Sequence, residues 1–194
     1  MTDADLEARI RALEEKLHDH GLLPIEEVSS GEARVESAGG NLPSPALGAR
    51  VVARAWVDAE FRSRLLSDAP SALEDYLPQG IPVAVLEDTP AVHHVIVCTL
   101  CSCYPSGLLG NPPTWYKSFE YRSRVVREPR AVLAEFGTVV PEGIEIRVHD
   151  STAEQRYLVL PLRPAGTDGW DEERLAGLVS RNSLIGTGFP LPPG

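Results

Sequence analysis

The chain has 194 residues, 43% of them hydrophobic, so one globular domain with a real core is expected and wholesale disorder is excluded. Its 18 basic and 28 acidic residues give a net charge of −10, which repels nucleic-acid phosphates and anionic lipid heads. The longest apolar run, from Val95 to Cys101, is too short to cross a membrane, and the N-terminus does not resemble a secretory signal. We therefore expect a cytoplasmic protein with neither a nucleic-acid nor a membrane partner.

The sequence of residues 1–47 predicts a helical arm followed by a linker. A narrow apolar stripe runs along the arm at helical spacing, formed by Leu6, Ile10, Leu13 and Leu17. Such a stripe fits equally an arm that lies on another subunit and a helix that folds back onto its own domain. Residues 29–45 are rich in glycine, proline and small polar residues, a composition typical of linkers. The globular domain is expected over 48–194.

This domain mixes short helical and strand-like segments. Helical periodicity predicts helices that begin near residue 48 and that cover 61–66, 71–77, 114–136 with a break at Pro129, and 172–179 after an N-cap at Asp171. Runs rich in β-branched residues predict strands at 83–86, 94–97, 144–148 and 157–160. Because strands and helices do not alternate strictly, we expect an α+β fold.

The three cysteines of the chain lie together in the run CTLCSC, at Cys98, Cys101 and Cys103. An odd number of thiols this close together cannot form a disulfide framework and favours metal or redox chemistry. The alternative is that the three cysteines have no chemical role and are buried as small hydrophobic residues. A structural zinc site would require a fourth side-chain ligand, and a thioredoxin-like CxxC would leave the third cysteine unexplained. The nearest residues that could supply a fourth ligand are His93, His94 and His149.

A third arrangement uses the backbone as well as the sulfurs. If the three thiolates wrap one ion, the amide nitrogens of Ser102 and Cys103 lie close enough to bind it too. Five ligands then leave a sixth octahedral position open, which is what a catalytic metal requires. Thiolates and deprotonated amides are strong electron donors, so this set favours a trivalent, low-spin cobalt or iron ion over zinc.

The run CTLCSCYP resembles the metal-binding signature of the nitrile hydratase α subunit, and the following LLGNPPTWYKSFEYRSRVVREPRAVLAEFG is similar to the continuation in that family. The likeness extends from GARVVARAWVD upstream to SLIG downstream. It implies a layered α-β-β-α fold, a metal-binding catalytic domain over 48–194, and hydration of a nitrile to an amide. The related thiocyanate hydrolase γ subunit shares the motif and remains an alternative, as does a non-catalytic zinc or redox module.

The resemblance also implies a state for each cysteine. Cys98 remains a thiolate, Cys101 is oxidised to sulfinic acid and Cys103 to sulfenic acid, in keeping with selective oxidation of metal-bound thiolates. Thr99 and Tyr104 follow the cobalt pattern of the family, so one Co(III) ion per chain is expected rather than Fe(III). The nucleophile is either the sulfenate oxygen of Cys103 or a water that the metal activates.

Two departures from the family concern the surroundings of the metal. Gln79 aligns with a glutamine near the active site, but Ile81 stands where the family often has glutamate, which weakens an acidic relay. Many members read Tyr-Pro-Trp-Pro after the cysteines, whereas this chain has Ser106 in place of the indole. We expect a wider pocket and a bulky heteroaromatic or nucleoside nitrile, as in the toyocamycin nitrile hydratase branch, unless a β-subunit side chain fills the space.

Partners are implied as well. The resemblance predicts a β subunit, made of one or two polypeptides, that supplies two arginines to the oxidised sulfurs, and a metallochaperone-like activator. On that basis the isolated chain is expected to be inactive. His149 is expected at a surface or interface, and salt bridges between chains are expected from the one local basic cluster. This cluster consists of Arg122, Arg124, Arg127 and Arg130.

Overall fold

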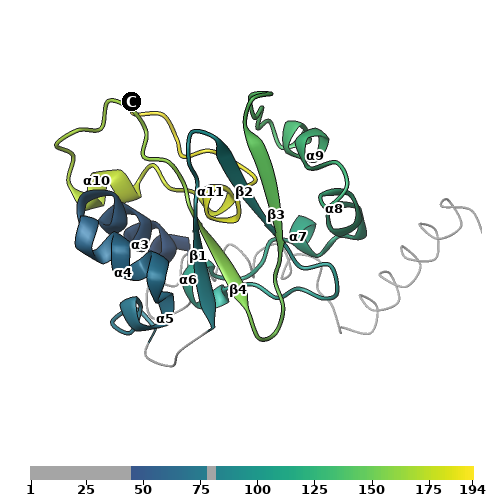
Figure 1. Ribbon diagram of the computed structural model, residues 1–194, viewed down its shortest axis with the longest axis horizontal. Helices are drawn as coiled ribbons and strands as arrows, with labels where there is room; N and C mark the ends of the chain where they lie inside the picture. The colour runs from purple at the N-terminus through teal and green to yellow at the C-terminus, as the bar shows by residue number, and fades with distance from the viewer. Residues whose placement is uncertain (1–44, 78–81) are drawn as a thin grey trace, which may run out of the picture. The chain divides into compact units, whose positions relative to one another are not determined.

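Two pairs of parallel strands form the centre of the fold, with groups of helices on both sides (Figure 1). The computed structural model describes residues 45–77 and 82–194. The helical arm and linker predicted before residue 45 lie outside the described residues, and so do Gln79 and Ile81.

Each predicted strand is confirmed, with ends that differ from the expectation by at most two residues. Strand β1 (Val83–Glu87) pairs with β4 (Arg156–Leu160), and β2 (Val92–Val97) pairs with β3 (Glu145–Asp150). Both pairs are parallel, so the carboxyl ends of the two partner strands lie together. This pairing joins segments that are far apart in the sequence, and it brings the end of β3 beside the cysteine loop.

Three predicted helices on one side of the strands are confirmed with shifted ends. Helix α3 (Pro45–Val57) begins three residues earlier than expected, and α4 (Ala59–Ser67) begins after Asp58, whose carboxylate caps it. Helix α5 (Ala69–Ala72) is capped by Asp68 and is shorter than predicted, because the chain continues from it as a turn. Helices α4 and α5 pack against β1.

Short helices account for most of the differences from the prediction. Helix α10 (Glu172–Ala176) begins after Asp171 as expected but ends early, because Ser180 caps a new helix, α11 (Arg181–Ile185). Neither α11 nor α6 (Ser106–Leu109) was predicted, since four or five residues are too few to display a helical period. Helix α11 lies against β2 and β4.

The stretch expected to form two helices forms three. Helices α7 (Thr114–Lys117) and α8 (Phe119–Arg124) are separated at Ser118, whose hydroxyl accepts a backbone N–H and caps α8. Helix α9 (Pro129–Glu135) begins at the predicted break, where proline occupies the first helical position. Figure 1 shows these three helices on the side of β3 that faces away from β1 and β4.

The hydrophobic core fills the space between the strands and the helices. Val52, Phe61 and Leu65 from α3 and α4 are buried in it, together with Val95 of β2 and Leu158 of β4. The layered α+β arrangement expected from the sequence is therefore confirmed for the described residues. Within the described ranges, no helix is both long enough and apolar enough to span a membrane.

Candidate metal centre

The three cysteines lie in the loop at the carboxyl end of β2, which we call the cysteine claw (residues 98–103). Cys98 is buried, Cys103 is half-buried and Cys101 is exposed. The Sγ atoms of Cys98 and Cys101 are 3.5 Å apart, those of Cys101 and Cys103 are 3.3 Å apart, and all three lie within 4.8 Å of one another. In residues 45–77 and 82–194, no other group of three His, Cys, Asp or Glu side chains is gathered closely enough to hold one ion.

The sulfur–sulfur distances fit a shared metal ion. Two thiolates bound at about 2.3 Å lie about 3.3 Å apart when their bonds are at right angles, and about 3.8 Å apart in a tetrahedron. The observed 3.3 Å matches the right-angle value, and the observed 3.5 Å lies between the two values. Both pairs are therefore close enough for their sulfurs to bind one ion.

A peptide N–H group of the claw also faces one of its sulfurs, because the backbone N–H of Cys101 donates to the sulfur of Cys98 at 3.3 Å. Hydrogen bonds with the thiols of Cys103 and Cys98, with smaller effects of the Ser102 and Cys103 backbone, lower the pKa of the Cys101 thiol to about 7. The shared hydrogen bond with Cys101, followed by burial, raises the pKa of Cys103 to about 11. The claw thus stabilises a thiolate, which is the form of cysteine that binds metals.

Asp150 fixes the first turn of the claw from the neighbouring strand. Val97 and Asp150 are partners in the register of β2 and β3, so the two strands end together. The Asp150 carboxylate accepts hydrogen bonds from the backbone N–H of Thr99 at 2.9 Å and from its hydroxyl at 2.5 Å. A serine hydroxyl could make the same bond, so this contact alone does not explain why threonine accompanies cobalt in the family pattern.

Side chains from α7 and α8 hold the backbone of the claw. The Tyr116 hydroxyl donates to the carbonyl oxygen of Cys103 at 2.9 Å, and Arg122 Nη1 donates to the carbonyl oxygen of Cys101 at 3.1 Å. Tyr104 is buried edge-on against Tyr116, with 5.1 Å between ring centroids. Burial raises the pKa of both phenols, so both remain protonated near neutral pH.

The sequence did not single out Asp150 or Tyr116, and it gave Arg122 a different role. All three act on the claw from other elements, and their residue types have no motif of their own. The only local sign of Asp150 was its place just after a predicted strand. That place indicates a role at the claw only when it is known that this strand, β3, pairs with β2. Gln79, the other residue expected near the metal, lies outside the described residues.

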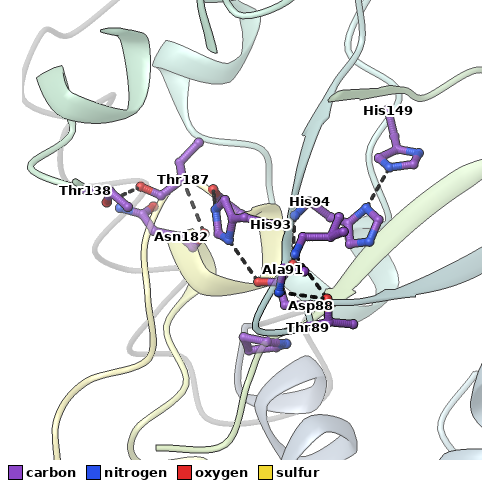
Figure 2. A network of polar contacts seen from close by, with 12 residues as sticks. Asp88, Thr89, Ala91, His93, His94, Thr138, His149, Asn182 and Thr187 are labelled. Carbon is purple, nitrogen blue, oxygen red and sulfur yellow. Dashed lines mark hydrogen bonds and ion pairs between the residues drawn. The ribbon is translucent and has the colours of Figure 1, made fainter. Parts of the chain in front are cut away.

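The described histidines do not complete a zinc site (Figure 2). His93 and His94 leave opposite faces of β2, as expected, and neither is grouped with the three cysteines. His93 Nδ1 lies 3.0 Å from the Asp88 carboxylate and its Nε2 lies 2.8 Å from the Gly186 carbonyl oxygen. His94 Nδ1 lies 2.8 Å from His149 Nε2. His149 is half-buried in this pair, and the expected surface or interface position of this residue remains a prediction.

The arginine cluster makes several contacts within this chain. Arg124 binds the carboxylates of Glu128 and Glu135, each at 2.6 Å. Arg130 donates to the backbone carbonyl oxygens of Val140, Pro141 and Ile144, which lie between α9 and β3. Arg127 donates to the carbonyl oxygen of Ser123. The expected salt bridges between chains remain a prediction.

Known proteins match this chain over nearly all of its length. The family model for the nitrile hydratase alpha chain matches residues 4–188. The low-molecular-weight cobalt-containing nitrile hydratase subunit alpha of Rhodococcus rhodochrous is 50% identical over 99% of this chain and 92% of that protein. The thiocyanate hydrolase subunit gamma of Thiobacillus thioparus is 42% identical over 97% of this chain and 82% of that protein.

A solved structure matches the fold as well. A double mutant of the Fe-type nitrile hydratase from Comamonas testosteroni Ni1 aligns with a TM-score of 0.75 and 41% identity, covering 100% of this chain and 94% of that chain. The family expected from the cysteine motif and the fold expected with it are both confirmed. The claw, its support by β3 and these matches lead to one conclusion: the chain belongs to the nitrile hydratase α-chain family and is an α subunit of that enzyme.

Proposed function

We propose that the claw holds one low-spin Co(III) ion and that the chain hydrates nitriles to amides. The ligands are the sulfurs of Cys98, Cys101 and Cys103 and the amide nitrogens of Ser102 and Cys103, which leave a sixth position open. The proposal is carried by the gathering of three sulfurs within 4.8 Å of one another at the carboxyl end of β2, beside the end of β3. Cobalt, rather than the iron of the Comamonas enzyme, is supported by Thr99 and by the cobalt-containing Rhodococcus relative.

The chemistry divides between the ion and the claw. When bound, the ion supplies a Lewis acid at the open position, where it polarises the carbon–nitrogen triple bond of the substrate. Cys101 and Ser102 are exposed, so the open position is accessible from outside this chain. We assign sulfinic acid to Cys101 and sulfenic acid to Cys103. The sulfenate oxygen of Cys103 either attacks the nitrile carbon or accepts a proton from the water that does so.

A β subunit completes the site in this proposal. The side chain of Leu100, inside the claw, is 88% exposed, and that of Phe119, one helical turn before Arg122, is 73% exposed. Large apolar side chains gathered beside a site indicate a surface that a partner covers. We propose that this partner is the β subunit and that it supplies arginines to the oxidised sulfurs, while an activator protein inserts the metal.

The substrate class is proposed from Ser106. It is exposed and begins α6, directly after the buried pair Tyr104 and Pro105, so a small side chain stands at the position where many family members have an indole. A pocket without that indole suits a bulky heteroaromatic or nucleoside nitrile. Turnover of acrylonitrile equal to or better than turnover of a bulky heteroaromatic nitrile by the assembled enzyme would contradict this choice. Gln79 remains a proposed residue of the same surroundings.

Product analysis tests the reaction. The chain is produced with its β partner and activator in cobalt medium, and the complex is given a nitrile or thiocyanate, with a Cys98→Ser complex as the inactive control. We expect the amide from the nitrile and no carbonyl sulfide from thiocyanate. Carbonyl sulfide as the main product would instead support the thiocyanate hydrolase alternative. The observation that favours this alternative is the 42% identity to the γ subunit of that enzyme. Stoichiometric zinc with unmodified cysteines would support a non-catalytic module.

A further inference from the structure

Arg122 contacts one of the two carbonyl oxygens whose peptide nitrogens are proposed as ligands. Its Nη1 donates to the carbonyl oxygen of Cys101 at 3.1 Å. This oxygen and the amide nitrogen of Ser102 belong to the same peptide group. The guanidinium is always charged near neutral pH, so the contact is a charge-assisted hydrogen bond.

The position of Arg122 is fixed by the residue before it. Tyr121 is buried, and its hydroxyl donates to the carbonyl oxygen of Ile96 in β2 at 2.7 Å. Ser118 caps the start of α8, so the helix is held both at its end and against the strand that leads into the claw. The Nε of Arg122 is buried without a partner among the described residues. Burying an unpaired N–H is unfavourable, so the stability of the fold alone does not account for this arrangement.

The chemistry of a peptide ligand gives this contact a function. A peptide group is planar because its nitrogen, carbon and oxygen share electrons. When the nitrogen of Ser102 binds a metal ion, its N–H bond is replaced by a bond to the metal and the proton goes to bulk water. The negative charge left on the peptide is then shared with the carbonyl oxygen of Cys101. A cation that already donates to this oxygen stabilises the charged peptide more than the neutral one.

We propose that Arg122 is a positioning residue for the metal: it holds the peptide between Cys101 and Ser102 with its nitrogen toward the claw and stabilises the charge that this peptide carries as a ligand. The inference rests on the proposed ligand set. It concerns a cation of this chain and is separate from the arginines proposed for the β subunit.

The test compares Arg122→Lys and Arg122→Met with wild type, all produced with the β partner and activator in cobalt medium. Lysine keeps the charge without the planar fork, and methionine keeps an apolar stem without charge. Arg127→Met is the matched control, because Arg127 lies exposed just beyond α8 and donates only to the carbonyl oxygen of Ser123. The readouts are cobalt per chain during dialysis against a chelator and the sulfur-to-cobalt charge-transfer absorption.

We expect Arg122→Met to lose cobalt about tenfold faster than wild type, corresponding to one charge-assisted hydrogen bond, and its absorption band to shift. Arg122→Lys should fall between the two, and Arg127→Met should match wild type. Equal cobalt loss and identical spectra in Arg122→Met and wild type would overturn the inference. So would an equal fall in thermal stability with and without metal, because that would indicate a purely structural role. A wild type that holds no cobalt would contradict the proposed function together with this inference.

Discussion

The hydrogen bonds of Asp150 show how much of a metal site can depend on residues that are not ligands. Its carboxylate holds both the backbone N–H and the hydroxyl of Thr99, the first residue after the buried Cys98. These two bonds fix the direction in which the claw leaves β2. The position of all three sulfurs therefore depends on one exposed carboxylate at the end of β3.

Substitution of Asp150 tests this dependence. Asp150→Ala removes both acceptors and should destabilise the loaded complex by about 1–2 kcal/mol, with faster loss of cobalt. Asp150→Asn keeps an oxygen acceptor and should be affected less. Thr99→Ser is the matched control for the hydrogen bonds, since it keeps both donors, and it should unfold at the same temperature as wild type. Thermal unfolding and metal analysis measure both effects, and wild-type cobalt retention in Asp150→Ala would contradict the account.

Residue patterns predicted the cysteine cluster but not the residues that support it. Cys98, Cys101 and Cys103 stand within six residues, so their spacing alone indicates a metal site. Asp150 and Arg122 are 52 and 24 residues from Cys98 along the chain, as the numbering gives, and only the fold brings them to the claw. A sequence read by itself contains no distance information for such pairs.

At the scale of elements, the end of α11 is packed very closely against β2. Gly186 ends this helix with a φ of +83°, and its carbonyl oxygen lies 2.8 Å from His93 Nε2. A Cβ atom on Gly186 would lie 1.8 Å from the carbonyl oxygen of His94. The position thus requires glycine both for its backbone conformation and for lack of space.

Two alanine substitutions separate these reasons. Gly169 also has a positive φ, of +76°, but a Cβ atom there would meet nothing within 4 Å. Gly169→Ala should therefore cost about 1–2 kcal/mol of unfolding free energy, which is the backbone strain alone. Gly186→Ala should cost clearly more, because β2 or α11 must move. Chemical denaturation of both variants measures the difference, and similar losses would show that the close packing is not required.

The histidines of β2 and β3 give stability opposite dependences on pH. Burial is the main effect on His94 and His149, and with the positive charge of Arg147 it lowers the pKa of both. Burial also acts on His93, but the hydrogen bond and charge of Asp88 outweigh it and raise its pKa. Both ring nitrogens of His93 face acceptors, which agrees with a protonated ring.

The signs follow from linkage. A histidine whose pKa is lowered by folding stabilises the fold above the unfolded pKa of about 6.5, and this stability is lost as the pH falls below that value. A histidine whose pKa is raised by folding stabilises the fold at low pH, and this stability is lost as the pH rises above that value. His149→Phe should therefore reduce the loss of stability between about pH 7 and about pH 5. His93→Gln should be most harmful at the acidic end and least harmful at the alkaline end. The measurement is the unfolding midpoint of each variant and of wild type at several pH values. If the midpoints of all three proteins depend on pH in the same way, these assignments are contradicted.

Local patterns explain which elements were predictable. The strands and the longer helices have a period that a short window reveals, and caps such as Asp58 and Asp171 mark where helices begin. Helices α6 and α11 are too short to display a period. The pairing of β1 with β4 joins residues more than 70 positions apart, so it follows from packing that no local pattern encodes.

At the scale of the whole molecule, the claw lies on a surface with large exposed apolar side chains. Leu100 and Phe119 are the most relevant, because one belongs to the claw and the other to the helix that carries Arg122. We interpret this surface as the area that the β subunit covers. The chain alone then has the metal ligands but an incomplete site.

A charge at Leu100 tests this interpretation. Leu100→Glu should weaken assembly with the β subunit by at least about tenfold, because a buried unpaired carboxylate is unfavourable at an interface. Val139→Glu is the matched control, since Val139 is a similarly exposed apolar residue, at 76%, in the loop after α9. Size-exclusion chromatography of the co-produced chains measures assembly. Normal assembly of Leu100→Glu would place the partner elsewhere.

X-ray absorption at the cobalt edge of the co-produced complex tests the central claim most directly. The account predicts one cobalt per chain in a six-coordinate site, with three sulfur atoms and light atoms that include two backbone nitrogens. A four-coordinate tetrahedral site, or the scattering pattern of a histidine ring, would contradict it.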